Sequence, residues 1–219
     1  MKNLLIILFV FAATALQAGN GLTVTQKYAA GAGGQNITVT WYVTSSQCKM
    51  KMQFSDKDLN TNTFFIPDVA GGQLLTYSDG PVPAGVQKTY FAIPVQNIKA
   101  KTAGGYTIQR TGETKLVSGI NCEKIIATGA STVTEMWVTK DFTPAFYRFA
   151  SFFKTDLALQ VLSEAKLEGF PVSSVTRDLN GNVTGSSELV SASTTDLADA
   201  EFKIPAEYKS AAEVSKAKK

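Results

Sequence analysis

Two consecutive runs of alternating side chains constrain the fold more than any other feature of this sequence. In ITVTWYVT (residues 37–44) large apolar residues occupy every second position, and CKMKMQF (48–54) repeats the pattern. A period of two places successive side chains on opposite faces of a β-strand. One face of each run is apolar and the other polar, which predicts an antiparallel sheet that is covered on one side.

Further strand-like runs are separated by turn-rich stretches such as residues 78–85. They lie at residues 63–67, 72–77, 88–94, 106–111, 114–119, 122–129 and 132–139. Turn signals about every ten residues are typical of a sandwich or a barrel-like sheet. Asn180-Gly181 between two alternating segments predicts a β-hairpin. A last strand is expected over residues 199–208.

The period of the pattern changes once, between residues 142 and 168. Large apolar side chains there recur at spacings of three and four, which predicts one long amphipathic helix. Pro144 falls in its first turn, where proline is tolerated. Gly169 and Pro171 are expected to end it. The fold class predicted from the sequence is therefore mainly β (α+β), with a single long helix.

The first residues have the three parts of a secretory signal peptide. A basic start is followed by the apolar run LLIILFVFAA and then by small residues, with cleavage expected after Ala15 or Ala18. We therefore expect a signal peptide over residues 1–18, a single β-rich domain over 19–209 and a flexible basic tail over 210–219. No second apolar run suggests a transmembrane segment.

The composition removes several classes of function. The chain has no histidine and only two cysteines, which excludes histidine-dependent catalysis and gives no zinc-ligand spacing. A net charge of +3 gives no indication of nucleic-acid binding. The string DKDLNTN (56–62) loosely resembles a calcium loop, but it lacks the turn glycine and the closing glutamate, so a polar turn is favoured. We expect no catalytic residues, no metal and no cofactor.

Cys48 and Cys122 both lie in strand-like runs. After export they would meet an oxidising compartment, where a disulfide between them is favoured over two buried free thiols. Such a bond would close a long loop and stabilise the fold by about 4 kcal/mol.

Aromatic side chains are numerous for a sheet with one helix. The candidates for ligand binding are Trp41, Trp137, Phe142, Phe146, Phe149 and Phe153. The simpler interpretation is core packing, because aromatic residues dominate most cores. The alternative is a concave sheet that its helix does not fill, which leaves a cavity for a lipid or another apolar ligand. Phe152, Leu159 and Leu162 fall off the main helical stripe, so more than one side of the helix is apolar.

Four motifs resemble a known bacterial family. They are TGETKxxxGxxC (111–122), EMWVTKD (135–141), GFP (169–171) and FKIPAEY (202–208). Together they resemble the family of domain of unknown function 4412, over residues 88–209. Ile120 and Glu207 depart from the family pattern, where an aromatic residue and a glycine are common. The resemblance implies an exported envelope protein of a Gram-negative bacterium, without an established reaction. It also implies a curved antiparallel half-barrel wrapped around a helix, similar to periplasmic lipoprotein carriers.

These observations lead to two hypotheses of function, neither of them enzymatic. The first is a periplasmic or secreted protein that binds a lipid or an acylated protein between the sheet and the helix. The second is an interaction or structural module of the cell envelope with a filled core and an unknown protein partner. An enzyme ranks third, because it would need carboxylates that converge in a cleft, and the spacing of candidates such as Glu113, Glu135 and Asp141 selects no pair.

Overall fold

The computed structural model describes residues 21–31, 36–54, 61–98, 105–142, 146–154 and 156–216. The expected signal peptide, most of the calcium-like turn and Pro144 lie outside these residues. The elements are β1 (Gly21–Ala30), β2 (Asn36–Thr44), β3 (Cys48–Phe54), β4 (Asn62–Asp68), β5 (Gln73–Ser78), β6 (Thr89–Pro94), η1 (Val95–Asn97), β7 (Thr107–Val117), β8 (Ile120–Thr128), β9 (Thr132–Thr139), α1 (Phe146–Ala150), α2 (Leu157–Glu164), β10 (Phe170–Asp178), β11 (Val183–Thr195), η2 (Asp199–Phe202), β12 (Lys209–Ser210) and α3 (Ala211–Lys216).

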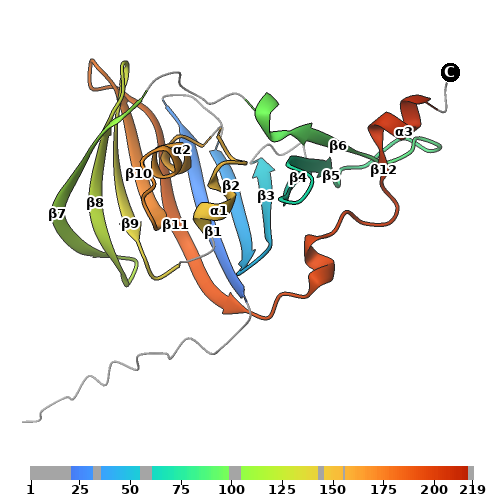
Figure 1. The fold of residues 1–219 in the computed structure, drawn as a ribbon, viewed down its shortest axis with the longest axis horizontal. Coiled ribbons are helices and arrows are strands. Elements are labelled where there is room, and N and C mark those ends of the chain that lie inside the picture. Colours follow the sequence, from blue (N-terminus) through green and yellow to red (C-terminus); the bar gives the residue numbers. More distant parts are fainter. Residues whose placement is uncertain are drawn as a thin grey trace, which may run out of the picture.

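The strands of the described residues belong to one twelve-stranded sheet in the order β12-β6-β5-β4-β3-β2-β1-β11-β10-β9-β8-β7. The two residues of β12 pair in parallel with β6, and the other strand pairs are antiparallel. The strands from β7 to β3 curve around α1 and α2 (Figure 1). A mainly β fold with a curved, open sheet is thus confirmed, as are the predicted strands β2–β6, β8 and β9 and the hairpin of β10 and β11. Residues 106–111 and 114–119, predicted as two strands, form the single strand β7 instead.

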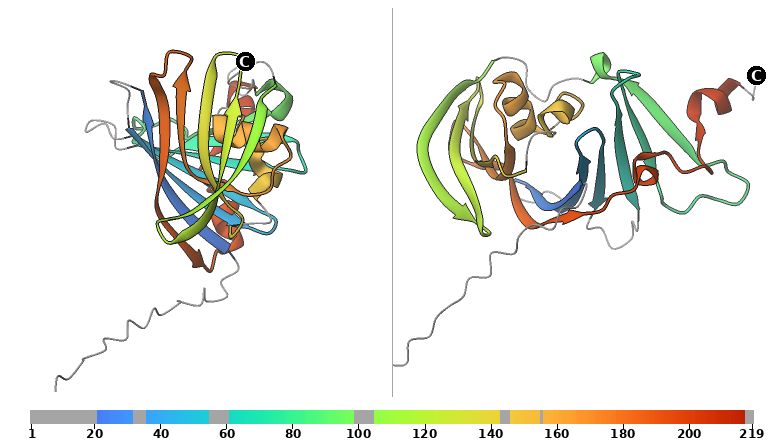
Figure 2. Two further views of the ribbon diagram at one scale, coloured as in Figure 1. Left: turned by 90° about the vertical axis from the view of Figure 1, so that its left-hand side faces the viewer. Right: turned by 60° about the horizontal axis from the view of Figure 1, so that its bottom comes forward.

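The concave face of the sheet and the two helices enclose the larger core. Trp41 on β2 makes edge-to-face contacts with Phe146 of α1 and with Phe153, at centroid distances of 5.0 and 4.9 Å. A second apolar cluster forms where α2 covers β8 and β9, with Val161 packed near Met136. The right-hand view of Figure 2 shows both helices inside the curve of the sheet. Burial of one apolar face by helices explains the alternation of the strands.

The prediction of one long helix over residues 142–168 is wrong. The described residues of this range form two short helices, α1 and α2. Two turn hydrogen bonds lie between them, from the Phe152 N–H to the Phe149 carbonyl and from the Phe153 N–H to the Ala150 carbonyl. Asp156 then caps α2, because its carboxylate accepts the N–H of Leu159 at 2.9 Å. An aspartate cap starts a new helix, whereas continuous apolar spacing says nothing about such a break.

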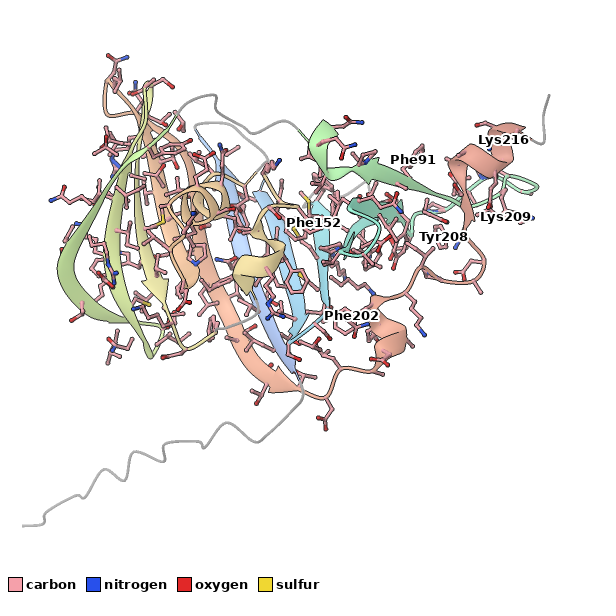
Figure 3. All side chains as sticks on the ribbon, viewed as in Figure 1. Phe91, Phe152, Phe202, Tyr208, Lys209 and Lys216 are labelled. Carbon is pink, nitrogen blue, oxygen red and sulfur yellow. The ribbon has the colours of Figure 1, made fainter. Side chains whose placement is uncertain are left out.

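The expected last strand over residues 199–208 is also wrong. Residues 196–208, here called the C-terminal strap, contain η2 and cross the face of β3–β5 that is opposite the helices (Figure 2). Phe202 and Tyr208, labelled in Figure 3, lie on the strap and are buried. Tyr208 packs on Tyr77 of β5 at 4.8 Å and donates its hydroxyl to the Ser78 carbonyl. Side-chain anchors therefore hold the strap in place of a strand ladder.

The tail predicted from residue 210 onward carries α3 in its described part, after Ser210 has paired with Tyr90 of β6. No residue of α3 is buried. The mobility of this tail stays a prediction.

The expected disulfide between Cys48 and Cys122 is not present, and both residues are buried free cysteines. They lie on β3 and β8, and five strands of the sheet separate these two. Burial raises the pKa of both thiols, and the Asp141 charge raises that of Cys122 further. Burial disfavours the thiolate, so each cysteine behaves as a small apolar core residue.

The TGETK motif forms an irregularity in the edge strand β7. The register with β8 shifts between Arg110 and Thr114, and the Thr111 hydroxyl donates to the Lys124 carbonyl in this interval. A bulge in an edge strand disrupts its exposed ladder and discourages pairing with other chains. The motif therefore has a structural explanation.

Candidate functional site

The register of three central strands places small side chains side by side on the concave face. Ala30 pairs with Gly185 on β11, which in turn pairs with Thr176 on β10. In the adjacent row, Ser187 lies between Tyr28 and Ser174. Small residues under a helix leave space that larger ones would fill.

A cavity of about 250 Å³ occupies this space, between the concave face and the start of α2. Its walls are mostly large apolar side chains: Trp41, Met50, Met52, Phe153, Leu157 and Ala158. Its floor consists of small or hydroxylated residues: Tyr28, Ala30, Ser174, Thr176 and Gly185. An apolar chamber with a few polar groups on one side is the usual form of a small-molecule site, although such sites more often measure about 300–1,000 Å³.

A buried glutamine fixes the wall of this cavity. Gln26 is fully buried, and its side-chain carbonyl accepts hydrogen bonds from Trp41 Nε1 at 3.2 Å and from the Tyr28 hydroxyl at 3.1 Å. Its amide donates to the Pro171 carbonyl at 2.8 Å, beside the register shift that lies between Pro171 and Ser173. Gln26 therefore joins β1, β2 and β10 and orients the indole of Trp41.

Asp156 is the carboxylate among the described residues of the cavity lining. Burial raises the pKa of Tyr28 well above its ordinary value, and the neighbouring Asp156 charge and hydrogen bond raise it further. The Tyr28 hydroxyl therefore stays protonated, and its single proton is directed to the Gln26 carbonyl and Asp156. Together with the hydroxyls of Ser174 and Thr176, it gives one side of the cavity hydrogen-bonding capacity.

The six aromatic residues proposed for ligand binding lie in different places. Trp41 and Phe153 line the cavity. Phe146 and Phe149 are fully buried in the larger core cluster, and Phe142 packs beside Phe170 at 5.7 Å. For these three residues core packing describes the structure, and any contact of the six with a ligand stays a prediction.

Trp137 lies apart from this cavity. It alternates with Met136 and Val138, which pack beneath α2, so its ring is on the other face of β9. Lys115 Nζ lies 3.9 Å from the ring centroid and Lys124 Nζ lies 5.9 Å from it. Trp137 is partly buried and also packs against the larger core cluster.

Several lining residues were not predicted. Met50 and Met52 occupy the apolar side of the CKMKMQF run, and flexible methionines suit a surface that adapts to a ligand. The two methionines on the apolar side of this run were therefore a signal in the sequence that could have identified this part of the lining. The hydroxyl floor had no such signal. The predicted hairpin brings Ser174 and Thr176 beside Gly185, but only the pairing of β11 with the distant strand β1 adds Tyr28 and Ala30 and completes the floor.

A second cavity, of about 410 Å³, lies beside β7–β9 and the segment after α2. Its lining carries charges of both signs, and Arg110 and Glu123 form an ion pair within it. Paired charges of this kind are ordinary on a protein surface. In the part of the chain that the structure describes, no three acidic or cysteine residues gather as metal ligands, and no helix is long and apolar enough to span a membrane.

Three solved structures are similar to this chain at low sequence identity. An uncharacterised conserved protein from Thermus thermophilus matches with a TM-score of 0.50 and 12% identity, over 86% of this chain and 87% of that one. The MucA/MucB complex of Pseudomonas aeruginosa matches at 0.49 and 13%, over 85% of this chain and 56% of that one. A putative outer membrane lipoprotein-sorting protein domain from Vibrio parahaemolyticus matches at 0.39 and 10%, over 85% and 91%. The first likeness supports the fold alone, and the other two are too distant to carry an argument.

No curated protein matches this sequence. A family model does match, from residue 23 to residue 208, and so includes the N-terminal third that the motifs had placed outside the resemblance. The match contains the strands that form the cavity and the strap that covers β3–β5. The chain belongs to the family described as domain of unknown function (DUF4412).

Proposed function

We propose that this protein is a non-enzymatic, exported binding protein that holds an apolar ligand between its curved sheet and α2. The ligand is a lipid, or the acyl chain of a modified protein. The observation that supports this proposal most is the cavity bounded by Trp41, Met52 and Phe153. Its volume of about 250 Å³ suits one short chain or chain segment rather than a whole lipid.

The rigidity of the cavity wall supports the same proposal. Trp41 is held by Phe146, by Phe153 and by the Gln26 carbonyl, so the apolar wall exists before a ligand arrives. A preformed site loses less conformational entropy when it binds.

Gly185 offers a direct test, because a side chain at this position would enter the cavity. A Cβ there would have only the Ala29 carbonyl within 4 Å, at 3.8 Å, so a larger residue fits the backbone. We expect the purified protein to carry a bound lipid in native mass spectrometry and Gly185→Leu to carry much less. Gly105→Leu is the matched control, since Gly105 is exposed and has no neighbour within 4 Å.

If wild type and both variants all appear without a ligand when lipid is supplied, the proposal fails. It also fails if Gly185→Leu, shown to be folded by circular dichroism, retains as much lipid as Gly105→Leu.

A second candidate function is a protein-interaction module of the envelope, and the edge strand β7 favours it. Leu116 on this strand is 71% exposed, beyond the bulge that disrupts the ladder. An exposed edge can receive a strand from a partner. A photo-reactive residue at Leu116 should then capture one dominant protein, whereas one at Val190, also exposed but on β11, should not. Equal capture at the two positions would remove this candidate.

A further inference from the structure

A row of paired side chains connects the wall of the cavity with the far strands of the sheet. Trp41 on β2 pairs with Met50, and Met50 pairs with Phe65. Phe65 in turn pairs with Thr76, which pairs with Phe91 on β6. Directly paired residues lie on the same face of a sheet, so the whole row lies on the concave face, which bears the helices. The four residues from Met50 to Phe91 are here called the lateral row.

The lateral row begins inside the cavity and ends in an exposed aromatic side chain. Met50 lines the cavity and is buried, whereas Phe91 is 56% exposed. The strands β4 to β6 extend beyond α1 and α2 (Figure 1), and Phe91 is labelled on β6 in Figure 3. An exposed apolar side chain so near the edge of a sheet favours aggregation unless something covers it.

We infer that the lateral row holds the outer part of a long alkyl chain whose inner part fills the cavity. The inference rests on the proposed function and names its ligand class, a lipid with one chain that is longer than the cavity can hold. The cavity of about 250 Å³ suits only a segment of such a chain. Because Met50 belongs to both the cavity and the lateral row, the rest of the chain can continue over Phe65 to Phe91 without leaving apolar surface.

The dimensions of the lateral row set the chain length at which it contributes. Three strand spacings separate Met50 on β3 from Phe91 on β6, a distance of about 14 Å. An eight-carbon chain is shorter than this, so octanol in the cavity does not reach Phe91. A sixteen-carbon chain reaches from the cavity over the lateral row. Each strand contributes one side chain to the row, which therefore has the width of a single chain.

Phe91→Ser tests the lateral row without a change in the cavity. Phe91 is exposed, so the substitution removes little of the core. Leu179→Ser is the matched control, since Leu179 is 69% exposed and lies in the turn between β10 and β11. Thr76→Val is a variant with the opposite expected effect, because it replaces a hydroxyl group of the row with a methyl group.

The probes are octanol and hexadecanol, and the assay is the displacement of a fluorescent alkyl alcohol from the full chain. Phe91→Ser should raise the dissociation constant of hexadecanol by about five- to tenfold and should leave that of octanol within about twofold. Thr76→Val should tighten the binding of hexadecanol by about two- to threefold, and Leu179→Ser should change neither alcohol. The comparison within each variant removes the general gain in affinity that any longer chain has.

The outcomes separate this inference from the proposed function. If Phe91→Ser weakens hexadecanol no more than Leu179→Ser does, or weakens both alcohols equally, the role of the lateral row is overturned and the cavity proposal stands. If an N-hexadecanoyl tripeptide binds in a Phe91-dependent manner and hexadecanol does not, a free lipid as the occupant is overturned. If neither alcohol binds the wild type, the proposed function fails, and the inference with it.

Discussion

At the scale of single residues, Gln26 links the fold to the site. A polar residue that is fully buried and fully hydrogen-bonded specifies one arrangement of its neighbours. The same residue explains why β1 could not be predicted from the sequence. The apolar alternation of GLTVTQKYAA breaks at Gln26, so this central strand has no clear period of two. A buried glutamine can be recognised as structural only when its hydrogen-bond partners are known. Two partners of Gln26 are the Pro171 and Val172 carbonyls of β10, which is far away in the sequence.

We predict that Gln26→Leu lowers the free energy of unfolding by about 2–4 kcal/mol, because Trp41 Nε1 and the Tyr28 hydroxyl lose the Gln26 carbonyl as an acceptor and the Pro171 carbonyl loses its donor. Urea denaturation measures the change. Gln53→Leu, at an exposed position on β3, should change stability by less than about 0.5 kcal/mol. Equal effects of the two substitutions would contradict the structural role of Gln26.

At the scale of elements, the hairpins and meander were predictable and the helix break was not. The hairpin of β10 and β11 follows from Asn180-Gly181, and Asp178 stabilises its loop by accepting the N–H groups of Asn180 and Asn182. The break between α1 and α2 depends on Phe152 and Phe153. Both are buried, and their spacing fits a helical stripe as well as it fits a packed turn.

For the hairpin we predict a cost of about 1–2 kcal/mol for Gly181→Ala, because Gly181 has a φ of +85° and a Cβ there is strained by the backbone alone. Thermal or urea denaturation measures this cost. Gly105→Ala adds the same methyl group to an exposed segment without a left-handed φ, so it should have almost no effect. If neither variant changes the free energy of unfolding, the left-handed conformation of Gly181 in the loop is contradicted.

The strap gives a prediction about alkaline pH. Burial between the sheet and the strap raises the pKa of Tyr77 from 10.0 to about 12. The unfolded chain therefore ionises Tyr77 at a lower pH than the folded protein does. The contribution of the neutral hydroxyl to stability is complete below about pH 10 and is lost as the pH rises toward 12.

Tyr77→Phe, which cannot ionise, should accordingly reduce the loss of stability between pH 10 and pH 12. Urea denaturation at a series of pH values measures it, and Tyr106→Phe, outside this cluster, serves as the control. The assignment is contradicted if Tyr77→Phe follows the same alkaline decline as the wild type.

At the scale of the whole molecule, the sequence predicts the kind of sheet but not what covers each of its faces. Alternation in β2 and β3 predicts one buried face, yet the strap also covers the other face of β3–β5. Phe64 and Ile66 show this, since they alternate with Phe65 in β4 and pack toward Ile204 and Tyr208. When a segment far away in the sequence covers one face of a strand, the residues of that strand carry no local pattern that indicates it. For the same reason the cavity floor was not predictable, whereas two residues of its wall, Trp41 and Phe153, are among the six aromatic candidates named from the sequence.

The two cysteines give a prediction for the whole chain. Because Cys48 and Cys122 are free and buried, the intact mass should be that of the dithiol, and a reductant should not change the free energy of unfolding. A thiol reagent should react with neither residue until the protein unfolds. A mass two daltons lower, together with destabilisation by reductant, would show that the disulfide forms after all.

The central claim is that an apolar ligand enters the cavity beside Trp41. The protein has two tryptophans, and only Trp41 lines the cavity. The most direct measurement is tryptophan fluorescence of Trp137→Phe and Trp41→Phe during titration with a long-chain alcohol that carries bromine, a short-range quencher. The account predicts saturable quenching in Trp137→Phe, where Trp41 is the reporter, and no saturable quenching in Trp41→Phe. Quenching of Trp137 with Trp41 unaffected would contradict it.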